Sequence, residues 1–427
     1  MILPPRHGAA LQRRRQALRR ACVITERNLF AMVELSGTPS ANRIRIAFFG
    51  RRNAGKSSLI NALTGQSLAI VSDIPGTTTD PVSKAMELLP LGPCVVTDTA
   101  GLDDEGELGE LRIGKSLAVL ETADIAVLAV PCAAEEGAVE SRVRALCRQR
   151  NIALVVARTK ADECPGFQAA AGEVPVSSVT GAGVEELRGR MAAACPQEVP
   201  PPLVADLASR GDIVLCVCPM DEAAPKGRLI LPQQQVIREL LDIGAAAMVC
   251  QPGELAHLVA AIGAERIRFA VTDSQAFGAV SSVLPREIPL TSFSILFARQ
   301  KGDLKTLCRG AAAIGNLEDA DTVLIAEGCT HRRQCGDIGS VKIPRWLERH
   351  TGKKLKFAFA SGGDFPIDGA APPKLVVHCG GCMLTRRAVM ARLRKCAELG
   401  VPVVNYGVAI GLMHGIVANP ETCMVER

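Results

Sequence analysis

The stretch Ile44-Arg-Ile-Ala-Phe-Phe-Gly-Arg-Arg-Asn-Ala-Gly-Lys-Ser57 decides the fold of this 427-residue chain. Its last eight residues, 50–57, match the pattern G-x-x-x-x-G-K-[ST], and an apolar strand precedes them. A helix is predicted from Lys56 onward, so the loop joins a strand to a helix N-terminus, where backbone N–H groups can wrap phosphate groups. The sequence therefore predicts a nucleotide-binding α/β domain built on a parallel sheet.

Two further motifs complete the predicted phosphate and magnesium site. Lys56 would reach the β- and γ-phosphates, and the Ser57 hydroxyl would bind Mg²⁺. Asp98-Thr-Ala-Gly101 follows a second strand, which places the Asp98 carboxylate near Mg²⁺ and the Gly101 N–H near the γ-phosphate. The Thr-rich segment 73–80 lies between these motifs and is expected to supply another hydroxyl. The expected Mg²⁺ ligands are Ser57, Thr78 and Asp98, and the expected catalytic residues are Lys56, Thr78, Asp98 and Gly101.

Two later loops are predicted to contact the base. In Thr159-Lys160-Ala-Asp162, the carboxylate can accept hydrogen bonds from both N1–H and N2–H of guanine, and an acceptor left unpaired by adenine gives discrimination on the order of 10⁴. Asn usually occupies the position of Thr159, so that contact departs from the usual pattern. Ser177-Ser178 fits the last base-contacting loop. The residues expected to bind GTP are Gly50, Asn53, Ala54, Gly55, Lys56, Ser57, Ser58, Thr77, Thr78, Asp98, Gly101, Thr159, Lys160, Asp162, Ser177 and Ser178.

Composition argues against several classes of protein. Residues 1–31 hold seven arginines against one acid, so this segment carries a charge of +6 while the rest of the chain sums to −1. The basic balance belongs to an N-terminal extension, expected over 1–41. An Arg-rich, acid-poor start is typical of an organelle transit peptide, and the alternatives are a disordered extension or the artefact of a start upstream of Met32. No uncharged apolar run reaches the ~18–20 residues of a membrane helix. Aromatic residues are only 3% of the chain, which argues against base-stacking platforms and nucleic-acid binding.

The order of strand and helix patterns divides the chain into three α/β blocks. Proline-containing linkers are predicted at 196–202 and 285–289, so the blocks cover residues 42–198, 203–288 and 289–427. In the first block, strands are predicted at 44–49, 94–97, 125–130, 154–157 and 174–176, and helices at 56–63, 107–120, 140–150 and 183–194. In the other two, strands are predicted at 213–218, 322–326, 355–360, 375–377 and 401–405, and a helix at 231–243.

The last block carries a candidate metal site. Cys329-Thr-His331 is followed after 46 residues by His378-Cys379-Gly-Gly-Cys382, and each half comes directly after an apolar strand. In open α/β sheets, ligands bind outside the carboxyl ends of strands. An iron–sulfur cluster favours all-thiolate ligation, and the glycine pair leaves an open face. A structural zinc site with Cys₃His or Cys₂His₂ ligands, or unrelated buried cysteines, would explain the same residues.

The order of motifs over 43–195 resembles translation-factor-class GTPases, and the Arg-Asn-Ala-Gly-Lys-Ser-Ser and Gly-Thr-Thr stretches are similar to the TrmE/Era group. That resemblance implies a K⁺ ion bound by Asn53 beside the phosphates. Leu102 follows Gly101, where Ras-like proteins have a water-orienting Gln, so intrinsic turnover should be slow. A K⁺ ion could supply the positive charge that an arginine finger supplies elsewhere.

A GTPase of this group followed by C-x-H-x₄₆-H-C-x-x-C resembles the HydF family, GTPase maturation factors of FeFe-hydrogenase, over the chain from about Met32. The resemblance implies a cytoplasmic homodimer or tetramer with a GTPase domain, a central dimerisation domain and an iron–sulfur domain. It implies that Cys329, Cys379 and Cys382 bind a 4Fe–4S cluster, with His331 or His378 as candidates for an exchangeable fourth ligand. It also implies a scaffold role, in which a diiron precursor made by the maturases HydE and HydG is assembled here and delivered to apo-hydrogenase HydA.

The alternative to this scaffold role is an RNA-linked GTPase that acts in ribosome assembly or tRNA modification and carries a structural zinc site. The C-terminal 128 residues hold 18 Lys and Arg against 12 Asp and Glu, a mildly basic balance that is compatible with it. Two features count against it. The block lacks an aromatic platform, and Cys423 is followed by Met-Val rather than by the Gly-Lys ending of TrmE.

Overall fold

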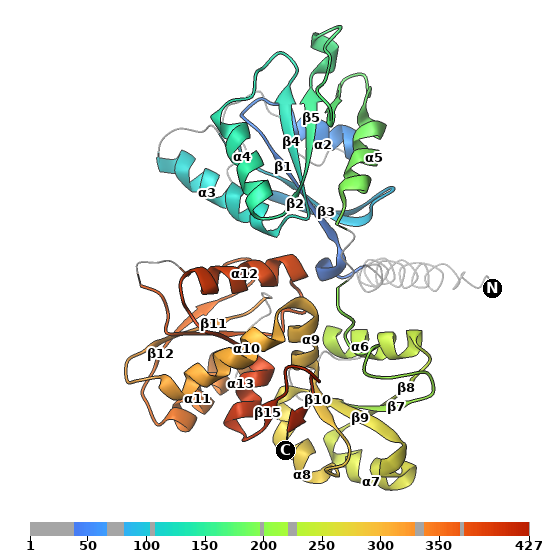
Figure 1. Ribbon diagram of the computed structural model, residues 1–427, viewed down its shortest axis with the longest axis vertical. Coiled ribbons are helices and arrows are strands. Elements are labelled where there is room, and N and C mark those ends of the chain that lie inside the picture. Colours follow the sequence, from blue (N-terminus) through green and yellow to red (C-terminus); the bar gives the residue numbers. More distant parts are fainter. Residues whose placement is uncertain are drawn as a thin grey trace, which may run out of the picture.

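The computed structural model describes residues 38–65, 81–102, 107–196, 200–220, 229–328, 337–367 and 371–426. Four predicted site residues, Thr77, Thr78, Cys329 and His331, lie outside these ranges, as do residues 1–37 of the expected N-terminal extension. The described residues form three sheets. One lies in the upper part of the molecule in Figure 1, and the other two make up the lower part.

The upper sheet has the strand order β2-β3-β1-β4-β5-β6. All neighbours pair in parallel except β2, which runs antiparallel to β3. Strand β2 was not predicted, because it is an edge strand whose side chains are mostly exposed and therefore lacks an apolar pattern. The strands of the upper sheet are β1 Ile44–Phe49, β2 Val82–Leu88, β3 Gly92–Asp98, β4 Ile125–Pro131, β5 Ala153–Thr159 and β6 Glu173–Pro175. The helices of this part are α2 Lys56–Thr64, α3 Glu107–Thr122, α4 Ala138–Gln149 and α5 Val184–Ala194.

Strand β1 shows why this sheet is covered by helices on both faces. Ile46 and Phe48 pack in one buried cluster with α2 and α5, whereas Ala47 and Phe49 pack in another with α3 and α4. Because successive side chains of a strand point to opposite faces, a strand that is apolar throughout is buried on both. Gly50 follows the strand, and a Cβ atom there would lie 2.4 Å from the Ala129 carbonyl oxygen, so only glycine lets the loop turn this close to β4.

The second sheet has the order β15-β16-β10-β9-β7-β8. Its central strands come from the middle of the chain, but β15 and β16 are the last two strands of the protein. Its strands are β7 Ile213–Val217, β8 Ala246–Cys250, β9 Ile267–Thr272, β10 Leu290–Ser292, β15 Val417–Ala418 and β16 Val425–Glu426, with helices α6 Leu231–Asp242, α7 Leu255–Ile262 and α8 Phe277–Val283.

The third sheet, β12-β11-β13-β14, is parallel throughout. It shares one continuous buried core with the second sheet, and β10 belongs to the second sheet, so the predicted division at 288/289 falls inside a common core. Its strands are β11 Thr322–Ala326, β12 Lys356–Ala360, β13 Leu375–His378 and β14 Val403–Asn405, and the helices are α9 Phe293–Lys301, α10 Leu304–Ala311, α11 Ile343–Thr351, α12 Arg386–Glu398 and α13 Tyr406–Met413. Short helical turns are η1 Ser40–Asn42, η2 Ala161–Glu163, η3 Pro252–Glu254, η4 Ala264–Arg266, η5 Ser274–Ala276, η6 Ala312–Asn316 and η7 Ile338–Lys342.

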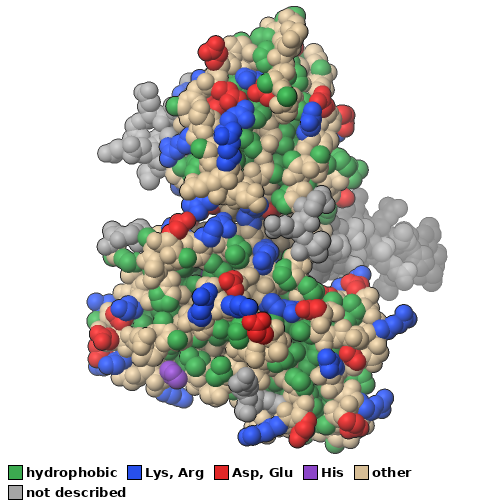
Figure 2. All heavy atoms as spheres, viewed as in Figure 1, with side chains coloured by type: hydrophobic (Ala, Val, Ile, Leu, Met, Phe, Trp, Pro, Cys, Tyr) green, Lys and Arg blue, Asp and Glu red, His purple; other side chains and the backbone are tan. Residues whose placement is uncertain are grey.

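The upper and lower parts meet where α12 packs against α3 (Figure 1). Figure 2 shows Lys and Arg side chains gathered along this seam. Within the described ranges, none of the helices is long and apolar enough to cross a membrane.

Candidate functional site

The loop between β1 and α2 is shaped to surround a phosphate chain. Lys56 is the first residue of α2 and is only 8% exposed. Its ammonium group donates hydrogen bonds to the carbonyl oxygens of Gly50 (3.1 Å) and Arg51 (2.7 Å), so it lies within the ring of the loop. Backbone N–H groups at the start of α2 have no partners in the preceding turn of helix and carry the positive end of the helix dipole. A polyphosphate is the ligand that such a loop fits.

Ser57 and Asp98 form a candidate Mg²⁺ site beside this loop. The Ser57 hydroxyl donates to Asp98 Oδ2 at 2.6 Å. Within the described part of the chain, Asp98 Oδ1 is buried and has no hydrogen-bond partner. Burial raises the pKa of Asp98. The hydrogen bond from Ser57 and the charge of Lys56 oppose this rise but are smaller than the effect of burial. A buried carboxylate oxygen without a partner beside a serine hydroxyl fits a hard divalent cation, which prefers oxygen ligands.

The Asp98 motif is tied directly to the phosphate loop. Thr99 Oγ1 donates to the Phe48 carbonyl oxygen at 2.6 Å, and Leu102 N donates to the Gly50 carbonyl oxygen at 3.4 Å. Gly101, which lies between these two residues, is therefore held beside the loop. Thr77 and Thr78 lie outside the described residues.

Thr159 supports the phosphate loop instead of pointing away from it toward a base. It is buried at the end of β5, and its hydroxyl donates to the Ala54 carbonyl oxygen at 2.7 Å. A Cβ atom at Gly55 would lie 3.6 Å from Thr159 Cβ, so the two chain segments are in close contact. Thr159, which stands where Asn is usual, therefore makes a polar link between β5 and the loop.

The two predicted base loops are adjacent in the structure. Ala161 N donates to the Val176 carbonyl oxygen at 3.2 Å, which joins the loop that carries Lys160 and Asp162 to the Ser177 loop. The Ser177 hydroxyl is buried and accepts from the backbone of the two residues after Ser178, which fixes that turn. The Asp162 side chain is exposed and Ser178 is half-buried.

Asn53 lies within the phosphate loop, and Ser58 lies in the helix that follows it. Asn53 is exposed and adopts a left-handed backbone conformation with φ of 58°, which Asn tolerates better than most residues. Ser58 is half-buried in the first turn of α2. The Asn53 amide is therefore accessible beside the phosphate loop.

The two halves of the cysteine motif converge at the carboxyl edge of the third sheet. Strands β11 and β13 pair side by side, and Cys379 N donates to the Ala326 carbonyl oxygen at 2.9 Å. Gly328 N donates to Cys379 Sγ at 3.0 Å, and Gly381 N donates to the same sulfur at 3.4 Å. Gly328, the last described residue before the 329–336 segment, therefore lies against the C-x-x-C loop. Amide donors to cysteine sulfur are among the features that set the properties of iron–sulfur clusters, so this donor set fits such a group.

Cys379 and Cys382 are both half-buried, and Cys329 lies outside the described ranges. Within those ranges, no group of three or more His, Cys, Asp and Glu side chains is placed to hold a metal ion. The structure therefore shows two of the three predicted cluster cysteines on one short loop, with the chain leading to the third beside them.

His378, a predicted candidate for the fourth ligand, has protein partners at both ring nitrogens. Nδ1 lies 2.7 Å from the Cys379 carbonyl oxygen, and Nε2 lies 3.1 Å from a guanidinium nitrogen of Arg392. The guanidinium can only donate, so Nε2 accepts and Nδ1 carries the proton. Burial, together with the charge of Arg392, lowers the pKa of His378 to about 4. The ring is thus neutral and positions the loop.

Two buried cations beside this loop were not predicted. Lys301 ends α9 and Arg392 lies in α12; both are nearly inaccessible, at 4% and 6% exposed. Neither stands out in the sequence, because Lys301 follows ordinary helical residues and Arg392 is one of several basic residues in its helix. The packing of α9 against α12 and β14 brings them to the loop that carries the cysteines.

Family models match most of the described chain. Residues 305–420 match the hydrogen maturase F tetramerization domain, and residues 203–302 match the hydrogen maturase F dimerization domain. Residues 45–160 match the 50S ribosome-binding GTPase family. The prediction of an α/β GTPase domain followed by further α/β domains is confirmed.

Individual relatives match the GTPase part. A tRNA modification GTPase MnmE of Methylobacterium radiotolerans is 38% identical over 152 residues, 35% of this chain and 32% of that protein. A GTPase Der of Wolinella succinogenes is 35% identical over 133 residues, 30% of this chain and 27% of that protein. The chain thus spans about a third of the length of these curated relatives. The crystal structure of Era with MgGDPNP and a segment of 16S ribosomal RNA is 18% identical and covers 49% of this chain and 91% of that chain, with a TM-score of 0.34.

Proposed function

The chain belongs to the hydrogen maturase F family, and from that premise we propose that it is a GTP-hydrolysing scaffold for the diiron precursor of FeFe-hydrogenase. In this proposal it binds a 4Fe–4S cluster, receives the precursor from the maturases HydE and HydG, and delivers it to apo-hydrogenase HydA. The matched dimerization and tetramerization domains support a homodimer or tetramer as the working form.

The GTPase site acts by positioning and by electrostatics. Lys56 neutralises charge on the β- and γ-phosphates, while Ser57 and Asp98, with Thr78, hold Mg²⁺. The Gly101 N–H binds the γ-phosphate, and the linkage of this motif to the Gly50 carbonyl oxygen through Leu102 supports that role. We assign to Asn53 a K⁺ ion beside the phosphates, which would add positive charge where the transition state develops negative charge. Asp162 would read the guanine base.

One observation carries the iron–sulfur part of the proposal. The 3.0 Å hydrogen bond from Gly328 N to Cys379 Sγ brings the chain that leads into Cys329 against the loop that carries Cys379 and Cys382. Three thiolates from two adjacent strand ends would hold the cluster and leave one iron for an exchangeable ligand, either His331 or a group of the precursor. The bound cluster would supply that open iron as an attachment point for cargo.

The RNA-linked alternative lacks support of its own. Its basis is the likeness to MnmE and Der, which is confined to the GTPase part. Residues 203–302 and 305–420 match the hydrogen maturase F domains instead. The proposal therefore assigns the last block to iron–sulfur chemistry.

A test of this function needs the full-length chain, purified without oxygen. We expect a brown protein that contains iron and acid-labile sulfide, gives the spectrum of a 4Fe–4S cluster, and activates apo-hydrogenase after incubation with HydE, HydG and GTP. A colourless protein that contains stoichiometric zinc would contradict the proposal. So would an iron-loaded protein that leaves apo-hydrogenase inactive.

A further inference from the structure

The last residue of α9, Lys301, is a buried cation that faces the C-x-x-C loop. Its ammonium group donates hydrogen bonds to the carbonyl oxygens of Gly381 (3.3 Å), Cys382 (3.1 Å) and Leu384 (2.7 Å). An ammonium group has three donors, and all three are directed to carbonyl oxygens of this one loop. The side chain also packs against Phe297, with Nζ 5.4 Å from the ring centroid.

No carboxylate of the described residues pairs with Lys301, although its chain neighbour Arg299 pairs with Asp206 at 2.8 Å. Carbonyl dipoles solvate an ammonium group but do not neutralise it. Removing a charge from water costs several kcal/mol unless an opposite charge lies nearby. A neutral amide could satisfy most of the same carbonyl groups at lower cost, so the three hydrogen bonds alone do not account for a charged residue here.

The ammonium group lies against the loop that carries Cys379 and Cys382, because its three hydrogen bonds end on carbonyl oxygens of residues 381, 382 and 384. The two sulfurs of this loop would bring negative charge beside the lysine when they bind a cluster as thiolates. A 4Fe–4S core held by three thiolates is a net anion that gains another negative charge on reduction. A buried cation fits this group better in its reduced form than in its oxidised form.

We propose that Lys301 is the counter-charge of the cluster site, a positioning residue that holds the 381–384 segment and stabilises the reduced cluster. This inference rests on the proposed function, because it assumes that Cys379 and Cys382 bind the cluster. Arg392 donates to His378 Nε2, next to Cys379 in the chain, and to the carbonyl oxygen of Gly362, so it is a second buried cation near this loop.

The test compares Lys301→Gln, Lys301→Arg and Lys305→Gln with the wild type in the full-length, anaerobically reconstituted protein. Gln removes the charge but still donates hydrogen bonds, whereas Arg keeps the charge and disturbs the shape. Lys305 is exposed on the neighbouring helix α10, so Lys305→Gln is a control that removes one lysine charge from a solvent-exposed position. The cluster is reduced by one electron from dithionite through mediators, and the reduced fraction is measured by electron paramagnetic resonance at fixed potentials.

For Lys301→Gln, the ratio of reduced to oxidised cluster at a given potential should fall at least about tenfold, which is about 59 mV for a one-electron couple. Lys301→Arg should stay close to the wild type, and Lys305→Gln should match it. Loss of iron in the Gln variant alone would also support a role for the charge. An unchanged ratio in Lys301→Gln, equal shifts in the Gln and Arg variants, or loss of iron in both would overturn it. A wild-type chain that binds no iron would overturn the proposed function as well, so the two failures are distinguishable.

Discussion

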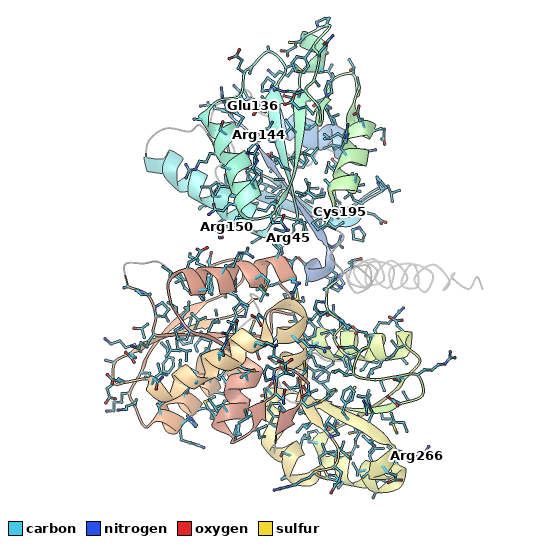
Figure 3. All side chains as sticks on the ribbon, in the orientation of Figure 1. Arg45, Glu136, Arg144, Arg150, Cys195 and Arg266 are labelled. Carbon is cyan, nitrogen blue, oxygen red and sulfur yellow. The ribbon has the colours of Figure 1, made fainter. Side chains whose placement is uncertain are left out.

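Arg387 Nε lies 3.4 Å from Asp124 Oδ1, and this pair joins the helix after the C-x-x-C motif to the nucleotide-binding part of the chain. Asp124 also accepts a hydrogen bond from Arg45 N at 2.8 Å, and Arg387 donates to the carbonyl oxygens of Arg150 and Asn151 at 3.4 and 3.2 Å. Arg45 and Arg150 lie at the lower edge of the upper part in Figure 3. The part that carries the C-x-x-C loop therefore contacts the nucleotide-binding part directly, and not only through the central block that separates them in sequence.

This seam connects the elements next to both sites. Helix α3 begins shortly after Gly101, and α12 begins shortly after Cys382. Their contact is polar and incompletely filled, with a cleft of about 300 Å³ between them and an ion pair of 2.8 Å from Arg150 to Glu398 across it. Polar contacts between parts of one chain favour relative motion.

Removing Arg387 should loosen the seam. We expect Arg387→Ala to accelerate backbone hydrogen exchange in residues 114–122 of α3 and in the second half of α12, because it removes two hydrogen bonds and an ion pair that cross between the parts. Arg238→Ala is the control, since it deletes an exposed Arg–Asp pair within α6. Unchanged exchange in α3 would show that the seam does not hold the two parts together.

GTP turnover should depend on K⁺ through Asn53. We expect the rate to rise several-fold when K⁺ replaces Na⁺ at equal ionic strength, and Asn53→Ala to abolish this difference while nucleotide binding persists. Because Asn53 has a φ of 58°, where alanine is strained, Asn53→Gly provides a second variant without that strain. Equal rates in both salts for the wild type, or retained stimulation in both variants, would contradict the K⁺ assignment.

Thr159 and Asp162 should fail in different ways. Thr159→Val keeps the shape but leaves the buried Ala54 carbonyl oxygen unpaired, which costs about 1–3 kcal/mol, so affinity for GTP should fall roughly tenfold or more. The preference for guanine over adenine should survive this change. Asp162→Ala should instead lose most of that preference. Competition binding with GTP and ATP checks both, and loss of selectivity in Thr159→Val would contradict the division of roles.

The parts of this structure that sequence could predict depend on local signals. Strand β1 and its phosphate loop follow from an apolar run, two glycines and a helix start, all within about twenty residues. The return of β15 and β16 to the second sheet depends on pairing with β10, more than a hundred residues earlier, and leaves no local pattern. The burial of Lys301 is of the same kind, because the loop that covers it is about eighty residues away in the chain.

His378 should make the stability of the iron-free chain depend on pH. Burial and Arg392 lower its folded-state pKa to about 4, from 6.5 when unfolded. The unfolded chain binds the proton more readily between these values, so the free energy of unfolding should fall as pH drops from 6.5 toward 4, by on the order of 3 kcal/mol. Denaturant unfolding at several pH values checks this. His378→Gln should weaken the dependence of the free energy of unfolding on pH, whereas His350→Gln, at an exposed position, should leave it unchanged. The same pH dependence in His378→Gln and the wild type would contradict the role given to His378.

Replacing the cluster cysteines tests the central claim most directly. Cys329→Ser, Cys379→Ser and Cys382→Ser are reconstituted anaerobically beside Cys308→Ser, a half-buried cysteine of the same block that lies outside the motif. Iron content, GTP turnover and activation of apo-hydrogenase are measured in parallel. Each of the three motif variants should lose most of its iron and all maturation activity, while GTP turnover persists, because the C-x-x-C loop follows a strand of a different sheet from the one that carries the nucleotide site. Cys308→Ser should match the wild type. Full iron retention in the three motif variants would contradict the ligand assignment, and iron loss with normal activation of apo-hydrogenase would contradict the scaffold role.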